Sequence, residues 1–87
     1  MSRRVAWERH AGDDIQALAG RDRRQAARIV DAIDRYAEHD RGDVLKLTGS
    51  SGEYRLRVGD WRIVFRLEDG GRDMTIARVL NRRDAYR

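Results

Sequence analysis

The 87-residue sequence contains no cysteine and no proline. Without cysteine there is no disulfide framework and no thiolate metal site, which leaves His10 and His39 as the neutral nitrogen ligands. Neither histidine has the spacing of a metal-binding motif. We therefore predict a protein that holds no metal and no other cofactor.

Long apolar segments are also absent. No run of 18 apolar residues is present, which a transmembrane helix would require. The first residues, Met1 to Trp7, lack the apolar region of a secretory signal. Because linker composition and proline are missing as well, no domain boundary is visible. We expect a cytoplasmic protein with no membrane contact and a single domain over residues 1–87.

Lysine is nearly absent, since 18 of the 19 basic residues are arginine and only Lys46 is lysine. A genome rich in arginine codons would explain the choice of arginine, but not its distribution. Residues 1–43 hold nine arginines and nine acidic residues, whereas residues 44–87 hold ten basic and six acidic residues. The second half thus carries the whole net charge of +4. This asymmetry predicts a phosphate-rich partner for the second half.

Residues 53–68 predict a β-hairpin with one apolar and one cationic face. Apolar and polar residues alternate on both sides of Gly59-Asp60, at the period of half-buried strands. A glycine in the first central position supplies the positive φ that a primed two-residue turn needs. This turn sets Arg57 opposite Arg62, and like charges opposite each other destabilise a sheet. We interpret that pair as a site for a polyanion. The opposite face should hold three pairs: Val58–Trp61, Leu56–Ile63 and Tyr54–Phe65.

The remaining patterns predict the order β-α-α-β-β-β, with two helices packed on one face of a small, mainly antiparallel sheet. The fold class is therefore α+β. The first expected helix is capped by Asp13 and ended by Gly20, and the second runs from Asp22 to a stop at Gly42. The expected strands are residues 4–7, the hairpin and a last strand at 74–80, and residues 44–47 should be extended.

The cationic face is expected to gather basic residues from several strands. The last strand predicts Arg78 and Arg82 on that face. A β-bulge shifts strand parity by one residue, so Arg83 is the alternative to Arg82. That strand is expected to place Ile76 and Leu80 beside Arg78 and Arg82, and Thr75, Ala77 and Val79 under the helices. The residues predicted to bind RNA outside the reacting centre are Lys46, Arg66, Arg78 and Arg83.

Residues 54–70 read Tyr-Arg-Leu-Arg-Val-Gly-Asp-Trp-Arg-Ile-Val-Phe-Arg-Leu-Glu-Asp-Gly, and the chain closes with Asn-Arg-Arg-Asp-Ala-Tyr-Arg. Together these segments resemble the RelE/ParE superfamily of bacterial toxins, over nearly the whole chain. The resemblance implies the RelE-like fold and the toxin half of a type II toxin–antitoxin module. It also implies a cognate antitoxin protein as partner and a toxin–antitoxin hetero-oligomer.

RelE-like members are ribosome-dependent mRNA endonucleases that act in the ribosomal A site, where a ribose 2′-hydroxyl attacks the adjacent phosphate. The resemblance implies that Arg62 and Arg82 hold the scissile phosphate. It implies that Arg55 and Arg57 position the backbone and polarise the 2′-hydroxyl, and that Tyr86 stacks on a base or assists proton transfer. The sequence identifies no general base, because arginine keeps its proton.

Two other functions remain open at this stage. ParE-like members share the fold but inhibit DNA gyrase by binding, without catalysis. A stand-alone RNA-binding module would use the same cationic sheet to hold a backbone without cutting it. The basic residues at all four family positions favour the endonuclease. The two alternatives are favoured by the absence of lysine in the hairpin and by Leu80-Asn81, which stands where Gly-His is common in the superfamily.

Overall fold

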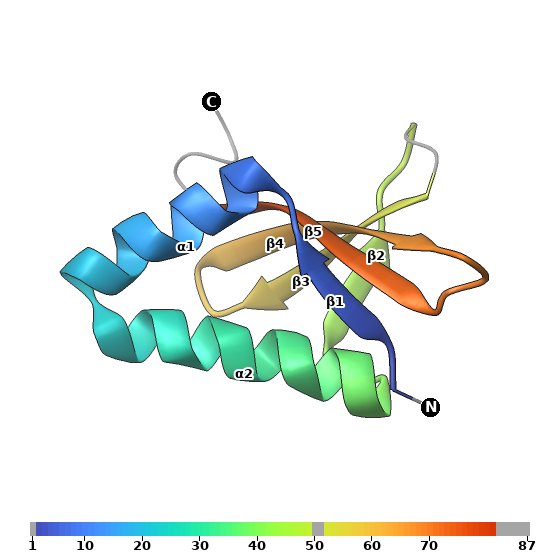
Figure 1. The fold of residues 1–87 in the computed structure, drawn as a ribbon, viewed down its shortest axis with the longest axis horizontal. Helices are drawn as coiled ribbons and strands as arrows, with labels where there is room; N and C mark the ends of the chain where they lie inside the picture. The colour runs from blue at the N-terminus through green and yellow to red at the C-terminus, as the bar shows by residue number, and fades with distance from the viewer. Residues whose placement is uncertain (1, 50–51, 82–87) are drawn as a thin grey trace.

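A computed structural model of the chain describes residues 2–49 and 52–81. Its helices and strands form a two-layer α+β domain in which both helices lie on one side of a single sheet (Figure 1). This confirms the predicted fold class, and the segment expected to be extended forms a strand of the sheet. The elements are β1 (Arg4–Trp7), α1 (Arg9–Arg21), α2 (Arg23–His39), β2 (Asp43–Lys46), β3 (Glu53–Val58), β4 (Trp61–Glu68) and β5 (Asp73–Asn81).

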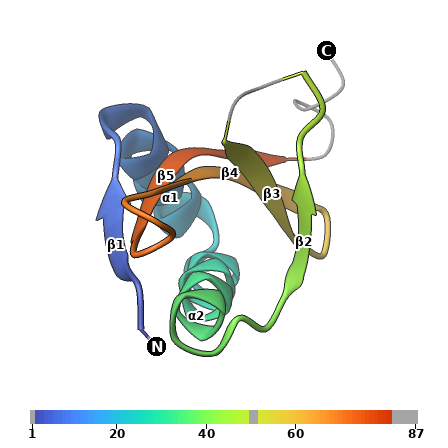
Figure 2. The same ribbon diagram turned by 90° about the vertical axis from the view of Figure 1, so that its right-hand side faces the viewer.

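The five strands lie in the order β1-β5-β4-β3-β2. Strand β1 runs parallel to β5, and every other neighbouring pair is antiparallel. Figure 2 shows the sheet curving around α2, with β1 and β2 at opposite edges. The helices therefore fill the concave side of the sheet. The strand residues that point to the other, convex side form what we call the open face. None of the described helices is long and apolar enough to span a membrane.

Helix α1 begins earlier and ends later than the sequence pattern predicts. It starts at Arg9 after Glu8, so the prediction of Asp13 as its N-cap is wrong, and Gly20 lies inside the helix. The start is set by a tertiary contact, because the Glu8 backbone N–H donates to the carbonyl of Ile76 at 2.9 Å. A distant strand cannot be read from local capping residues, which explains the error.

Helix α2 begins where expected and ends differently. The carboxylate of Asp22 accepts a hydrogen bond from the backbone N–H of Gln25 at 3.1 Å, which confirms its N-cap role. At the other end Asp40 adopts the left-handed conformation, with φ of 57°, and its N–H donates to Tyr36. The prediction that Gly42 ends the helix is therefore wrong. Gly42 instead permits close packing, because a Cβ there would lie 2.8 Å from Cδ1 of Leu56.

The hairpin has the predicted register. Arg57 lies opposite Arg62, and the three predicted apolar pairs face one another on the other side. Gly59 has a φ of 59°, while the φ of Asp60 is not positive. This φ pattern is that of a type II′ turn, in which only the first central residue needs a positive φ. The strands are thus joined by the primed turn that the Gly-Asp pair predicts.

Strand β5 contains a bulge that alters the predicted faces. Val64 pairs with Arg78 but Phe65 pairs with Ile76, so Ala77 is the extra residue. Beyond the bulge, Arg78 and Leu80 lie on the open face and Val79 lies under the helices, as expected. Before the bulge, the residues predicted for one face of the sheet lie on the other. Ile76, predicted for the open face, is fully buried under the helices, and Thr75 lies on the open face opposite Arg66.

The core lies between α2, the inner face of α1 and the concave side of β3, β4 and β5. Phe65 sits at its centre, with its ring centroid 5.4 Å from that of Tyr36 and 5.6 Å from that of Tyr54. Burying each such side chain contributes about 1.5–3 kcal/mol, so this layer holds the sheet rigidly against α2. The largest fully buried side chains are Phe65, Ile29, Ile33, Leu56, Ile63, Met74 and Ile76.

Candidate functional site

The open face of the sheet carries five of the predicted cations on three adjacent strands. The register of β3, β4 and β5 puts all five on the side away from the helices. Lys46 does not join them, because it pairs with Tyr54, whose ring faces the core. Arg82, Arg83 and Tyr86 lie outside the described residues. The five residues of the open face are Arg55, Arg57, Arg62, Arg66 and Arg78.

Arg57 and Arg62 are directly opposite each other in the β3–β4 ladder. Side chains in such pairs have Cβ atoms about 4.5–5.5 Å apart, so the two arginine side chains leave the sheet side by side. Arg57 is exposed, and within residues 2–49 and 52–81 its guanidinium has no ion-pair partner. Arginine does not lose its proton in proteins, so the repulsion cannot be relieved by titration. An anion bridging the two groups would relieve it.

Arg55 is held by the neighbouring strand. Its Nη1 donates to the carbonyl oxygen of Asp43 at 3.3 Å and to the carboxylate of the same residue at 3.4 Å. Asp43 also lies directly opposite Arg57 in the β2–β3 ladder. One carboxylate is therefore placed beside both hairpin arginines, and its side chain is 61% exposed. No local sequence pattern distinguishes this acid from the other carboxylates of the chain.

Arg66 is paired on both sides. Its Nη2 contacts the carboxylate of Glu8, and its Nε donates to Glu68 at 3.4 Å. The hydrogen bond to Glu8 raises the pKa of the Arg66 guanidinium above its ordinary value, and burial opposes this only in part. Arg66 thus ties the start of α1 to the sheet.

Arg78 reaches over the edge of the sheet to α1. Its Nε donates to Oδ2 of Asp14 at 2.9 Å, and the same oxygen accepts the backbone N–H of Val79, also at 2.9 Å. Strand β1 pairs only with Asp73 to Ile76, so this part of β5 is an edge. Asp14 satisfies an edge amide that would otherwise lack a strand partner.

These contacts change the charge of the open face. Arg55, Arg66 and Arg78 each pair with an acid from the first half of the chain, namely Asp43, Glu8 and Asp14, and Arg66 pairs with Glu68 as well. The net positive charge of residues 44–87 therefore does not survive folding as a free cationic surface. The pairs with Glu8 and Asp14 join residues 58 and 64 positions apart, so no local sequence signal could have revealed them. Within the described ranges, no group of three His, Asp or Glu side chains comes together as a metal site.

Comparison with known proteins identifies relatives of this architecture. Residues 5–86 match the family described as the ParE toxin of the type II toxin–antitoxin system parDE. No curated protein matches the sequence significantly. Among solved structures, the chain is similar to the archaeal RelE–RelB complex from Pyrococcus horikoshii, with 23% identity, a TM-score of 0.75, and coverage of 94% of this chain and 97% of that one.

Two bacterial structures are similar as well. The YoeB/ParE toxin from Agrobacterium tumefaciens has 20% identity and a TM-score of 0.77, and the match covers 90% of this chain and 96% of that one. The chromosomal ParDE system from P. aeruginosa has 16% identity and a TM-score of 0.69, and the match covers 91% of this chain and 95% of that one. At these identities the similarity demonstrates a shared fold.

Proposed function

The chain belongs to the ParE toxin family of type II toxin–antitoxin systems, and we propose that it is a ribosome-dependent mRNA endonuclease acting through its open face. The observation that carries this proposal is the Arg57–Arg62 pair, two like charges that face each other across the hairpin. A sheet gains no stability from this arrangement. A phosphodiester bound between the two guanidinium groups would be held in two-point contact.

The proposed reaction is attack of a ribose 2′-hydroxyl on the adjacent phosphorus. A bond forms between the 2′-oxygen and phosphorus, and the bond from phosphorus to the 5′-oxygen of the next nucleotide breaks. The departing 5′-oxygen takes a proton from solvent water, so the products carry a 2′,3′-cyclic phosphate and a 5′-hydroxyl. Arg57 and Arg62 would stabilise the charge that develops on the phosphoryl oxygens, which is the main contribution a protein makes to phosphoryl transfer. Arg82 and Tyr86 keep the roles that the family resemblance implies.

The reaction also needs a group that accepts the 2′-hydroxyl proton. We assign this role to Asp43, the carboxylate that lies opposite Arg57 and within 3.4 Å of Arg55. A carboxylate can act as a general base where arginine cannot. Arg55 would orient it, so that the arginine acts as a positioning residue and not on the phosphate itself.

A toxin of this type needs a partner that keeps it inactive, and we propose a cognate antitoxin protein that binds it in a cytoplasmic hetero-oligomer. The support is that similar folds occur in toxin–antitoxin complexes, including the RelE–RelB complex from Pyrococcus horikoshii. The ribosomal A site and its mRNA would be the target once the antitoxin is removed.

The direct test uses purified protein, ribosomes and a translated mRNA. We expect cleavage inside codons, with a 2′,3′-cyclic phosphate on the upstream fragment. An mRNA carrying a 2′-O-methyl group at the cleaved nucleotide should stay intact, since the attacking hydroxyl is blocked. Cleavage of the methylated mRNA, or no cleavage of either, would contradict the proposal.

A second candidate function is inhibition of DNA gyrase by binding. It is favoured by the description of the matching family, and by the ion pairs that occupy Arg55, Arg66 and Arg78 on the open face. A supercoiling assay with purified gyrase separates the two. Inhibition of supercoiling by a protein that leaves ribosome-bound mRNA intact would favour this function over the endonuclease.

A further inference from the structure

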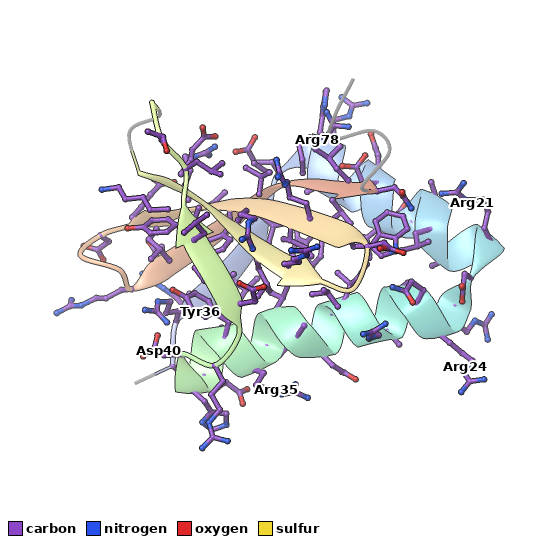
Figure 3. The ribbon with its side chains drawn as sticks, turned by 180° about the vertical axis from the view of Figure 1, so that it is seen from behind. Arg21, Arg24, Arg35, Tyr36, Asp40 and Arg78 are labelled. Atoms are coloured by element: carbon purple, nitrogen blue, oxygen red, sulfur yellow. The ribbon has the colours of Figure 1, made fainter. Side chains whose placement is uncertain are left out.

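A second arginine-rich region lies on the other side of β3. An open groove of about 960 Å³ runs between α2 and the hairpin end of the sheet. Arg24, Arg28 and Arg35 line it from α2, Arg41 lines it from the segment after α2, and Arg57 lines it from β3. Figure 3 shows Arg24 and Arg35 projecting from α2 on the side away from the sheet.

The helix presents these arginines as one stripe. At 100° per residue, Arg24, Arg28 and Arg35 fall within about 40° of one another, on the side of α2 opposite its buried residues. They span about 16 Å of helix, which corresponds to roughly four or five stacked nucleotides. The stripe is therefore long enough to follow a polyanion over several charges.

The groove arginines differ from those of the open face in their partners. Arg24, Arg28, Arg35 and Arg41 are all exposed, and the described part of the chain offers no carboxylate within 4.0 Å of their nitrogens. One acid, Asp31, lines the same groove. Five arginines against one aspartate leave a strong positive potential in a concave surface, where it concentrates anions.

The lining also indicates which class of macromolecule fits. An amphipathic protein helix binds a groove through large apolar anchors. Among the described residues the one large apolar side chain that is exposed is Leu45, which lies on the open face and not in the groove. The groove is lined mainly by arginines and by small residues such as Ala27, Ala32, Gly42 and Gly59, and its two larger apolar residues, Leu56 and Val58, are themselves buried. Close approach of a backbone is thus allowed, but a helix would find no large exposed apolar side chain to pack against.

Arg57 belongs to both regions, since it lines the groove and opposes Arg62 on the open face. We propose that the groove between α2 and β3 is a second RNA-binding site, which holds the phosphate backbone of the strand whose scissile phosphate lies at Arg57 and Arg62. The choice of RNA rests on the proposed function. Binding in the groove itself requires no cleavage.

The test measures binding of a fluorescent, fully 2′-O-methylated single-stranded RNA, which the proposed chemistry cannot cut, across a series of NaCl concentrations. The groove variant is Arg24→Gln/Arg28→Gln/Arg35→Gln. The matched control, Arg9→Gln/Arg21→Gln/Arg72→Gln, removes the same charge from three exposed arginines outside both regions. For a single strand, each phosphate contact adds about 0.7 to the slope of log K against log[NaCl]. The slope should therefore become shallower by about 2 in the groove variant and stay almost unchanged in the control.

Equal losses in the two variants would overturn the proposal, because net charge alone would then explain binding. A fluorescent polyglutamate peptide that binds as tightly as the RNA, with the same dependence on the groove, would overturn the assignment to RNA. So would a DNA strand of the same sequence that binds more tightly than the RNA. As a second variant, Asp31→Asn should tighten binding, since it removes the acid of the groove.

The outcomes separate this proposal from the endonuclease. Wild-type protein that binds methylated RNA through the groove but cuts no mRNA would contradict the proposed function alone. Wild-type protein that cuts mRNA while its RNA binding ignores the groove substitutions would contradict the groove site alone.

Discussion

The open face of the sheet and the groove beside α2 are both rich in arginine, but they carry different amounts of available charge. On the open face Arg55, Arg66 and Arg78 each contact a carboxylate. In the groove, the four arginines outside β3 have no such partner among the described residues. The comparison shows that the electrostatic potential of a surface cannot be judged from its number of arginines alone. The potential also depends on where the acidic side chains lie after folding.

This difference indicates separate roles for the paired and the unpaired arginines. Paired arginines are held in place and can orient neighbouring groups, as Arg66 and Arg78 do for α1. The unpaired arginines of the groove are exposed, and they can attract a polyanion from solution. Arg57 belongs to both regions and lies opposite Arg62 of the open face, which is where a strand held by the groove would meet the sheet.

The largest effect should come from Arg62 on the open face. Arg62→Ala should lower mRNA cleavage about 1000-fold, since it removes a donor to the developing phosphoryl charge. Single-turnover cleavage on programmed ribosomes measures this. Arg72→Ala, in the exposed turn before β5, is the matched loss of one charge and should cut like the wild type. If both variants cut equally well, the open face is not the reacting centre.

The two acids Asp43 and Asp31 allow the regions to be compared directly. Asp43→Asn should reduce cleavage about 100-fold, because a positioned general base typically contributes that much, while RNA affinity should not weaken. Asp31→Asn in the groove should leave the cleavage rate at saturating RNA intact and strengthen RNA binding. The mRNA cleavage rate and the affinity for RNA, measured separately for each variant, test both expectations. Loss of affinity without loss of rate in Asp43→Asn would refute its role as base.

A stability comparison uses the acids Asp14 and Asp31. Asp14→Ala should lower the free energy of unfolding by about 2 kcal/mol, because the Val79 N–H and Arg78 lose their acceptor at the sheet edge. Asp31→Ala removes an exposed acid without a described ion pair and should change stability by less than about 0.5 kcal/mol. Urea unfolding followed by circular dichroism measures both. Similar values for the two would show that Asp14 does not hold α1 to β5.

The smallest effect concerns the turn that separates the two regions. Gly59→Ala should cost about 1 kcal/mol, since φ at this position is 59° and a Cβ there would lie 3.3 Å from Nη1 of Arg28. Gly12→Ala, inside α1 with open space around its Cβ, should be neutral or stabilising. Thermal unfolding of the two variants tests this pair. A stabilised Gly59→Ala protein would mean that the turn does not need its glycine.

Much of the fold could be predicted from short-range patterns. The alternation around Gly59-Asp60 gave the hairpin register pair by pair, because a two-residue turn leaves no freedom in the pairing. Asp22 was recognised as a cap because its hydrogen bond reaches only to Gln25. The start of α1 and the bulge in β5 were not predictable in this way. Both depend on contacts between Glu8 or Phe65 and residues of β5 far along the chain.

For the candidate site, the sequence identified the arginines but not their partners. The direct opposition of Arg57 and Arg62 follows from the hairpin and was predicted correctly. The proposal for Asp43 and the groove of α2 needed the structure. Asp43 meets Arg57 through pairing of β2 with β3, and Arg28 reaches Gly59 through packing of α2 on the sheet.

The sequence by itself thus determined the fold class, the hairpin and the like-charge pair at its centre, since alternation and turn chemistry act over a few residues. Only the tertiary structure decided which arginines keep their charge available. Ion pairs join acids of the first half to arginines of the second, as in Glu8–Arg66 and Asp14–Arg78. Among the residues that the structure describes, no carboxylate pairs with an arginine of α2. Coulomb interactions depend on distance in space, and linear order along the chain does not supply that distance.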